Sequence, residues 1–392
     1  MLGLIFSDAI LYEIVPPGAK LAQEETARQA ERPLPRVSSR KAFMDQLYDM
    51  NHPPKERKPG QDSRGRFTEL KTYILERNGV FEPGQGKWAS WNIGNTSVDD
   101  IKILTVWPRG GVDPLQFYVD MDDRRYLLFH TEAPAENANS AMETLVEDGK
   151  HRLDHTWFHS SLMERWVGRL NGGFNGYAIN HGGLLREKTV TLKMEVSGTE
   201  ARRLYQSIAE LQGNDRLMSH EAIEVSHGSK KTLGGHVEER ISNTGYFSIK
   251  RGRSIQDHLH IVGDCKDEYS GIVKNVEKCR MGEATRGGSR TYGGNPIEIT
   301  YPKVEKLEPF VDTLFQATRP FRLWGIKVKR EDDYYSVPAV DLHEGSPIDF
   351  EITPELMRVY TRKGSCGNTI LRLLTNLQTH YSASVRCVET EC

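Results

Sequence analysis

The sequence lacks the features that mark secreted, membrane-spanning and metal-knuckle proteins. It has only five cysteines in 392 residues, an odd number without CxxC spacing, which argues against a disulfide framework or a zinc knuckle. No apolar run approaches the length of a membrane span. The apolar start carries Asp8 and Glu13 but no basic region, so it does not resemble a signal peptide. We therefore expect a cytoplasmic protein that makes no use of a membrane.

An excess of charge of one sign is also missing. The 52 basic and 54 acidic side chains leave a net charge of −2, so any nucleic-acid binding needs a local basic patch. With 37% hydrophobic and 27% charged residues, the composition is that of a globular protein. The chain is long enough for two or three domains.

Composition and periodicity divide the chain into three regions. Residues 1–66 hold the apolar start and, from residue 16, an extended arm rich in proline and charge, which suits ordering on a protein partner. Residues 67–186 predict a smaller α+β unit. Residues 187–392 repeat a β-α-β-β order, which predicts an α+β domain of antiparallel ferredoxin-like (RRM-like) sheets with helices packed on one face.

Local patterns in the middle region place individual elements. A helix is expected from Ala135 to Glu147, and a second from Leu153 to Leu170. Candidate strands precede them at Trp88–Ile93, Ile101–Trp107, Leu115–Asp120 and Arg125–His130.

The stretch 243–264 carries the most suggestive chemistry. Its residues predict two strands, Tyr246–Ile249 and Gln256–Val262, joined by a basic turn. Side chains alternate between the two faces of a strand, so three polar residues would share one face: Gln256, His258 and His260. Two imidazoles two residues apart on a strand can hold one divalent ion, such as Mg²⁺ or Mn²⁺.

His258-Leu259-His260 resembles the signature of the HUH endonuclease superfamily, which includes rolling-circle replication initiators and relaxases. The resemblance covers residues 187–363 and implies a ferredoxin-like domain, a metal held by both histidines, and a tyrosine nucleophile on a helix. Tyr360 and Lys363 match the family's Tyr-x-x-Lys pattern, on a short helix expected after Pro354.

These implied roles form a coherent mechanism. The metal would polarise the scissile phosphate, with Gln256 as the available third ligand on the same strand face. Tyr360 would attack and form a covalent phosphotyrosine bond, and Lys363 would neutralise the phosphate. A glycine-rich loop from residue 274 could follow the backbone of a single strand. The candidate phosphate contacts are Lys274, Lys278, Arg280, Arg286, Arg290, Arg251 and Arg253.

Other features allow two interpretations each. Asp120 and Asp122 resemble the first motif of primase-polymerases, with Asp341 as a third acid, but they also fit a hairpin turn. His151, His155 and His159 would form one stripe on a helix, either a metal site or a partly buried polar stripe.

Simpler structural interpretations also apply to the leading candidates. His258 and His260 equally fit the solvent face of an antiparallel sheet, and the basic loop fits a plain solvated loop. Cys366 precedes a predicted helix, a position that can lower the pKa of a thiol.

Two functions follow from these observations. The leading hypothesis is a metal-dependent single-stranded DNA or RNA nickase, an endonuclease acting through Tyr360. The alternative is a non-catalytic nucleic-acid-binding or scaffold subunit of a larger complex, which the arm at residues 16–66 favours. Fold alone does not choose between them, because ferredoxin-like sheets serve many unrelated functions.

Overall fold

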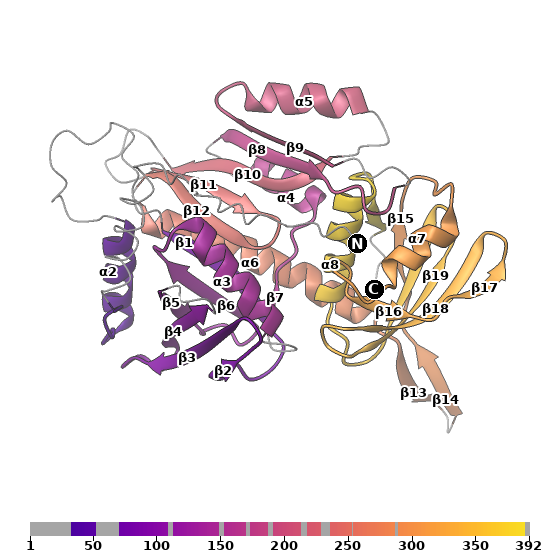
Figure 1. Ribbon diagram of the computed structural model, residues 1–392, viewed down its shortest axis with the longest axis horizontal. Helices are drawn as coiled ribbons and strands as arrows, with labels where there is room; N and C mark the ends of the chain where they lie inside the picture. The colour runs from indigo at the N-terminus through magenta and orange to yellow at the C-terminus, as the bar shows by residue number, and fades with distance from the viewer. Residues whose placement is uncertain are drawn as a thin grey trace, which may run out of the picture.

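Two antiparallel sheets lie side by side in this computed structural model, with the long helix α6 (Ile255–Lys278) passing from one to the other (Figure 1). The expectation of an α+β protein built on antiparallel sheets is confirmed. The structure describes residues 33–51, 70–108, 113–148, 153–169, 173–186, 191–212, 218–228, 236–252, 254–286 and 289–388.

The larger sheet has 12 strands in the order β2-β3-β4-β5-β6-β1-β12-β11-β10-β8-β9, and β7 also pairs β1. It spans residues 71–252, so the boundary expected between residues 186 and 187 falls inside it, between the paired strands β8 and β9. The strands are β1 (Lys71–Arg77), β2 (Gly84–Gln85), β3 (Ala89–Asn95), β4 (Ile101–Pro108), β5 (Leu115–Asp120), β6 (Tyr126–Thr131), β7 (Leu153–His155), β8 (Phe174–His181), β9 (Leu192–Ser197), β10 (Ser219–Gly228), β11 (His236–Ser242) and β12 (Tyr246–Gly252).

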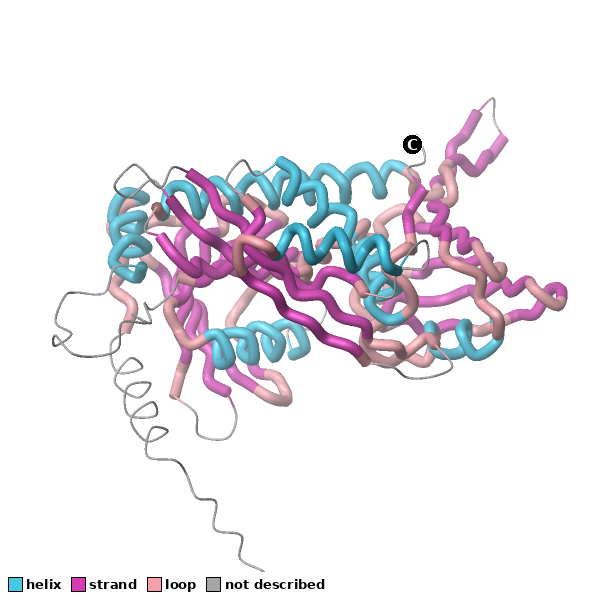
Figure 2. Tube along the Cα trace, turned by 90° about the horizontal axis from the view of Figure 1, so that it is seen from above, coloured by secondary structure: helices cyan, strands magenta, loops and turns pink. Residues whose placement is uncertain are grey.

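Helices cover both faces of this sheet, not one face as expected (Figure 2). Residues on opposite sides of β1 show why: Ile74 packs into one core, and Leu75 into the other. Strands buried on both faces need apolar cover on both. One core takes α3 (Ala135–Asp148), and the other takes α2 (Arg40–Asn51), α4 (Ser160–Arg169), α6 and the first turn of α5 (Ala201–Gln212).

Helix α6 replaces the strand expected at Gln256–Val262, so that prediction was wrong. Ser254 caps the helix by accepting a hydrogen bond from the backbone N–H of Asp257 at 3.1 Å. The buried positions then recur at helical spacing through Val273. The preceding strand, β12, is present as predicted but extends to Gly252.

The smaller sheet has seven strands in the order β16-β18-β19-β20-β15-β21, and β17 pairs β18. Helix α8 (Asn368–His380) is buried from Asn368 to Gln378 because it lies between the two sheets. Helix α7 (Leu307–Leu314) covers the core. The strands are β15 (Ile297–Thr300), β16 (Leu323–Gly325), β17 (Val328–Glu331), β18 (Tyr334–Asp341), β19 (Pro347–Ile352), β20 (Leu356–Thr361) and β21 (Arg386–Val388).

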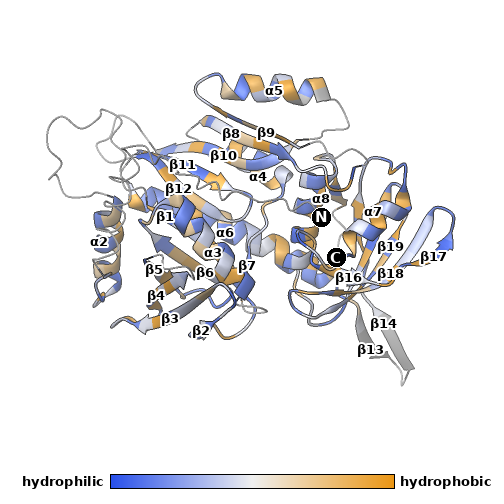
Figure 3. Cartoon of the chain, in the orientation of Figure 1, coloured by the Kyte–Doolittle hydropathy of each residue, from blue (hydrophilic) through white to orange (hydrophobic). Residues whose placement is uncertain are grey.

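A separate two-stranded hairpin, β13 (Gly282–Arg286) and β14 (Ser289–Gly293), projects away from the body (Figure 1). Hydrophobic residues concentrate on the inner strands and helices, whereas α5 mixes both kinds along its length (Figure 3). Across the described ranges, no helix is long and apolar enough to cross a membrane. Cys279 is disulfide-bonded, which the cysteine spacing did not predict, and Cys265, Cys366 and Cys387 are free thiols.

Candidate functional site

Three segments meet at the base of the β13–β14 hairpin. Helix α6 ends there, the hairpin begins, and the turn after β20 runs alongside. The backbone N–H of Met281 donates to the carbonyl of Thr361 at 2.7 Å, and the N–H of Lys363 donates to the carbonyl of Met281 at 3.2 Å. Arg362 forms an isolated parallel bridge with Met281. Lys363 and Arg362 are therefore held beside the hairpin although they lie about 80 residues further along the chain.

Basic residues outnumber acidic ones around the base of the β13–β14 hairpin. Residues 274–293 contain five basic and two acidic side chains. Lys274 and Lys278 are exposed one turn apart on α6, and Arg362 and Lys363 are exposed in the adjacent turn. Arg280 forms an ion pair with Glu277 at 2.9 Å, so its charge is partly compensated. Arg286 and Arg290 belong to the strands of the hairpin, and their side chains lie outside the part of the chain that the structure describes. Arg362 also pairs with Asp349 at 2.8 Å. We call Lys274, Lys278, Arg362 and Lys363 the hairpin surface.

The remaining basic candidates lie elsewhere. Arg251 is at the end of β12, beside the opposite end of α6, and lies 3.7 Å from Glu238. The 24 residues of α6 separate it from the hairpin by roughly 36 Å at 1.5 Å per residue. Arg253 lies outside the described residues. The sequence-based set of phosphate contacts is thus divided between two ends of one helix.

The proposed metal ligands do not converge. His258 is fully buried, whereas the side chain of His260 is 63% exposed and lies 3.4 Å from Asp264. Residues two apart on a helix point about 200° away from each other, so one ion cannot bridge these rings. Gln256 is exposed, one turn before His260. In the ranges described, no group of three or more His, Cys, Asp or Glu side chains could hold a metal.

Tyr360 lies on strand β20, and the short helix expected after Pro354 was wrong. Its hydroxyl donates to Glu351 at 2.9 Å. Partial burial, together with this carboxylate, raises the pKa of Tyr360 to about 12, which works against forming a phenolate nucleophile. Tyr360 belongs to the smaller sheet, whereas the side chain of His258 forms hydrogen bonds with Thr72 and Glu239 of the larger one. The arrangement does not assemble the nickase site that the motifs implied.

The acidic motif, and His155 and His159 of the histidine motif, lie in strands, turns and loops rather than in a metal site. Asp120 ends β5 and pairs with Arg40 at 2.7 Å, and a turn separates it from β6, as the turn interpretation predicted. His155 ends β7 rather than lying on a helix, and burial lowers its pKa to about 4. His159 precedes α4, and burial lowers its pKa to about 4 as well. His151 lies outside the described residues.

His258 instead belongs to a buried hydrogen-bonded chain. Its Nδ1 lies 2.6 Å from Glu239 Oε1, and its Nε2 lies 2.7 Å from the hydroxyl of Thr72. Thr72 in turn lies 2.9 Å from Nδ1 of His130. All four side chains are 0% exposed. We call this set the sheet-core chain.

The sheet-core chain has the hydroxyl–imidazole–carboxylate order of a catalytic triad. A catalytic role needs access to substrate, and none of its four side chains reaches the surface. Burial, with His258 nearby, lowers the pKa of His130 to about 3, so this ring is neutral at physiological pH. The phenyl ring of Phe43 on α2 packs edge-on against it, with centroids 5.7 Å apart. These features indicate a structural network.

A second buried network joins the two sheets. Arg372 on α8 donates to Asp154 of β7 at 2.9 Å and also to Asp341 of β18. All three side chains are only 1% exposed. Burial opposes the charge on Asp154, yet Arg372 holds the pKa of this carboxyl below its usual value. Thr369 adds a hydrogen bond to Asp341 at 2.6 Å.

The same network continues towards α6. Glu76 accepts from Arg125 at 2.6 Å and from the thiol of Cys366 at 3.2 Å. Arg125 also donates to Glu277 of α6 at 2.6 Å. Burial raises the pKa of Glu76 to about 7, although Arg125 opposes the shift. We call Asp154, Asp341, Arg372, Glu76, Arg125, Glu277 and Cys366 the inter-sheet network.

Sequence reasoning reached only parts of this network. Asp341 and Cys366 were singled out for other reasons, and the thiol pKa lies well above its usual value because of burial, not below it. Arg372 was missed, yet it stands within the run Ile370–Leu374, whose other four residues are apolar. An arginine in such a run signals a buried ion pair.

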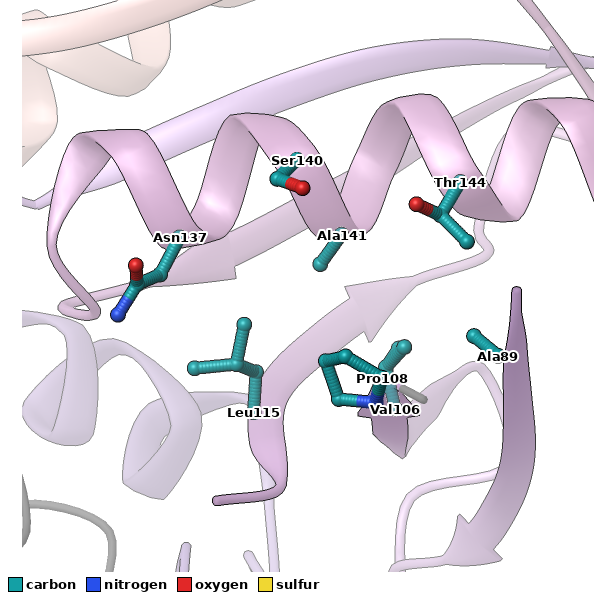
Figure 4. Close-up of a pocket in the computed structure, with 8 residues that line it drawn as sticks. All are labelled: Ala89, Val106, Pro108, Leu115, Asn137, Ser140, Ala141 and Thr144. Atoms are coloured by element: carbon teal, nitrogen blue, oxygen red, sulfur yellow. The ribbon is translucent and has the colours of Figure 1, made fainter. Parts of the chain in front are cut away.

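A small cavity lies between α3 and strands β3, β4 and β5 (Figure 4). Its volume is about 110 Å³, well below the ~300 Å³ lower bound of typical ligand pockets. Ser140 and Thr144 supply hydroxyl groups, and none of its lining residues is charged. It therefore offers no group for acid–base or metal chemistry.

Comparisons with known proteins identify a family, but they assign no activity to it. The family model described as "MJECL33-like protein" matches residues 32–391. The "Uncharacterized protein MJECL33" of Methanocaldococcus jannaschii is 25% identical over 358 residues, which cover 80% of this chain and 85% of that protein. No solved structure matches the chain. The family match includes both sheets, the hairpin and both buried networks.

Proposed function

The chain belongs to the MJECL33-like family, and we propose that it acts as a non-catalytic subunit that binds single-stranded nucleic acid through the hairpin surface. One observation carries the proposal: a projecting two-stranded ribbon has exposed basic residues from two chain segments, the end of α6 and the turn after β20, gathered at its base. Lysine and arginine side chains that follow a backbone supply most of the affinity for single strands.

The overall charge supports a local interaction. A chain with a net charge of −2 does not attract nucleic acid over its whole surface, so binding must concentrate where positive charge gathers. A narrow β-ribbon can also approach phosphates without a deep cleft. The proposal retains two finer expectations from the sequence, ferredoxin-like subdomains and a cytoplasmic location. The arm at residues 16–66 remains the proposed contact for protein partners, except helix α2, whose Phe43 and Leu47 are buried against this chain's own larger sheet.

The test is fluorescence anisotropy with labelled single-stranded DNA and RNA and a duplex control, over a series of salt concentrations. The variant Lys274→Ala/Lys278→Ala/Lys363→Ala removes three charges from the hairpin surface. We expect about tenfold weaker binding or more, and a salt slope that falls by about two, because each lost phosphate contact contributes about 0.7 for a single strand.

A matched variant, Lys193→Ala/Arg203→Ala/Lys329→Ala, removes three exposed charges from other surfaces and should bind like the wild type. Equal weakening in both variants, or no binding by the wild type at low salt, would overturn the assignment. If the wild type binds the duplex more tightly than the single strand, the ligand of the hairpin surface is duplex rather than single-stranded nucleic acid.

A denaturing gel tests the non-catalytic part of the proposal. The protein is incubated with labelled single-stranded DNA and Mn²⁺, beside Tyr360→Phe. We expect no covalent adduct, because Tyr360 donates to Glu351 in the smaller sheet while His258 is buried in the larger one. An adduct that disappears in Tyr360→Phe would restore the nickase hypothesis.

A further inference from the structure

A larger cavity lies between helices α4 and α5 and the face of β8 and β10, and we call it the α4–α5 cavity. Its volume is about 430 Å³ and it opens to solvent, which places it within the usual range of ligand pockets, roughly 300–1,000 Å³. Helix α5 lies at the edge of the molecule far from the β13–β14 hairpin (Figure 1). The cavity is therefore separate from the hairpin surface.

The floor of the cavity is aromatic and held in place. The ring of Tyr205 lies 4.9 Å from that of His220 and 6.3 Å from that of Phe174, centroid to centroid. The Tyr205 hydroxyl donates to Glu164 at 2.6 Å and lies 3.0 Å from Nε2 of His220. A hydroxyl has one proton, so His220 donates from Nε2 to the tyrosine oxygen. This chain orients the tyrosine ring before any ligand arrives.

The rim carries opposite charges at its two ends. Arg202 and Glu210 both lie on α5, both are exposed, and both line the cavity. Eight residues on a helix correspond to roughly 12 Å, so the charges are well separated. Neither side chain forms an ion pair within the part of the chain that the structure describes. Both charges therefore line the cavity without compensation from any described residue.

We propose that the α4–α5 cavity binds a nucleoside monophosphate whose base carries an exocyclic amino group. The base stacks on Tyr205, as bases do on aromatic side chains. The phosphate binds Arg202, whose planar guanidinium suits phosphate oxygens. The amino group donates to Glu210 at the other end. The separation of the two charges is comparable to the extended length of such a ligand.

Isothermal titration calorimetry of the full chain with AMP, CMP, UMP, adenosine and inorganic phosphate tests this assignment. AMP and CMP should bind with one site per chain. UMP, which lacks the amino group, should bind more weakly, and inorganic phosphate alone should bind far more weakly than AMP. Arg202→Ala should weaken AMP binding about tenfold or more while leaving adenosine binding unchanged, because it removes only the phosphate contact.

The neighbouring Arg203 gives a matched control. Its side chain is 86% exposed, lies 3.9 Å from Glu200 and does not line the cavity, so Arg203→Ala should bind AMP like the wild type. Tyr205→Leu should weaken AMP and adenosine alike, and its melting curve shows whether the fold is intact. Absence of heat with every nucleotide at millimolar concentration would overturn the proposal. Equal losses in Arg202→Ala and Arg203→Ala, or phosphate binding as tightly as AMP, would also overturn it.

Discussion

Near the start of helix α6, hydrogen bonds of the sheet-core chain connect His258 to side chains of the larger sheet only. At the other end, the inter-sheet network uses Arg372 to join a carboxylate from each sheet. Thr72 and His130 face each other because β1 and β6 pair directly. No strand pairing links Asp154 to Asp341, since they belong to different sheets. Backbone pairing places Thr72 opposite His130 in the first network, whereas side-chain charges connect the sheets in the second.

This difference sets how each network should respond to substitution. Removing Arg372 leaves two buried carboxylates without their shared cation, which should cost more than removing one hydrogen-bond partner from the sheet-core chain, whose only acidic side chain is Glu239. A chain positioned by paired strands keeps its geometry when one member is lost. The inter-sheet network should therefore dominate stability, and the sheet-core chain should contribute less.

The largest effect is expected for Arg372→Met. The substitution leaves Asp154 and Asp341 buried at 1% exposure without their cation, which should lower the free energy of unfolding by about 3–5 kcal/mol. Urea unfolding followed by circular dichroism measures the change. Arg358→Met removes an exposed partner of Glu298 and should change stability little. Similar losses in both variants would refute a dominant role for the inter-sheet network.

Glu76→Gln should change how stability depends on pH. The folded pKa of about 7 exceeds the ordinary 4.5, so between these values the folded state holds a proton that the unfolded state has lost. Wild-type stability from this group is full below pH 4.5 and falls as the pH rises to about 7. The difference of about 2.5 pKa units corresponds to a loss of about 3 kcal/mol in the free energy of unfolding, at 1.36 kcal/mol per unit.

The glutamine variant should not show this loss at the site, because its amide keeps one charge state while still accepting from Arg125 and Cys366. Unfolding in urea at several pH values compares the two proteins. The charged and titratable groups around Glu76 are Arg125, Cys366, Asp154, Tyr126 and Tyr269. Parallel pH curves for wild type and variant would show that Glu76 does not titrate in this range.

Much of the larger sheet could be predicted from local sequence. The strands expected at Ile101–Trp107 and Leu115–Asp120 appear as β4 and β5 within one residue, and the helix from Ala135 ends one residue later than expected. These elements follow one another closely along the chain, so alternation and turn residues carry enough information. Asp120 illustrates the point, since the turn that follows it was predicted from its neighbours.

The helix expected from Leu153 to Leu170 was wrong in its first part, where β7 precedes α4. Two further elements were misassigned because short windows fit two periodicities. Residues 256–262 alternate like a strand, but the apolar positions continue at helical spacing to Val273, far beyond that window. Residues 356–361 alternate in burial as β20, whereas Pro354 suggested a helix start.

The hairpin surface was partly predicted, since Lys274 and Lys278 are close in sequence, whereas Arg362 and Lys363 lie about 80 residues further along the chain. The inter-sheet network could not be predicted, because Arg372 and Asp154 are 218 residues apart.

His258→Leu should destabilise the protein less than Arg372→Met. Glu239 and Thr72 each form a hydrogen bond with His258, at 2.6 Å and 2.7 Å, and both stay buried when this partner is removed. The free energy of unfolding should therefore fall by about 2 kcal/mol. The matched variant is His260→Leu on the same helix, at a side chain that is 63% exposed, where little change is expected. Chemical unfolding of the two variants measures the difference. A larger loss for His260→Leu would contradict the assigned faces of α6.

The smallest effect is expected for His130→Leu, at the end of the sheet-core chain. Thr72 keeps its bond to His258, and Nε2 of His130 has no hydrogen-bond partner within the described residues, so the loss at pH 7 should be about 1 kcal/mol or less.

The pH dependence expected from His130 has the opposite sign to that of Glu76. The folded pKa of about 3 lies below the ordinary 6.5, so the unfolded state binds the extra proton and wild-type stability falls as the pH drops below 6.5. Leucine cannot titrate, so the variant should gain stability relative to wild type between pH 6.5 and pH 5, which unfolding in urea at these pH values measures. A variant that loses stability relative to wild type over this range would show that His130 is protonated in the fold, and the sheet-core chain would then hold a buried cation as the inter-sheet network does.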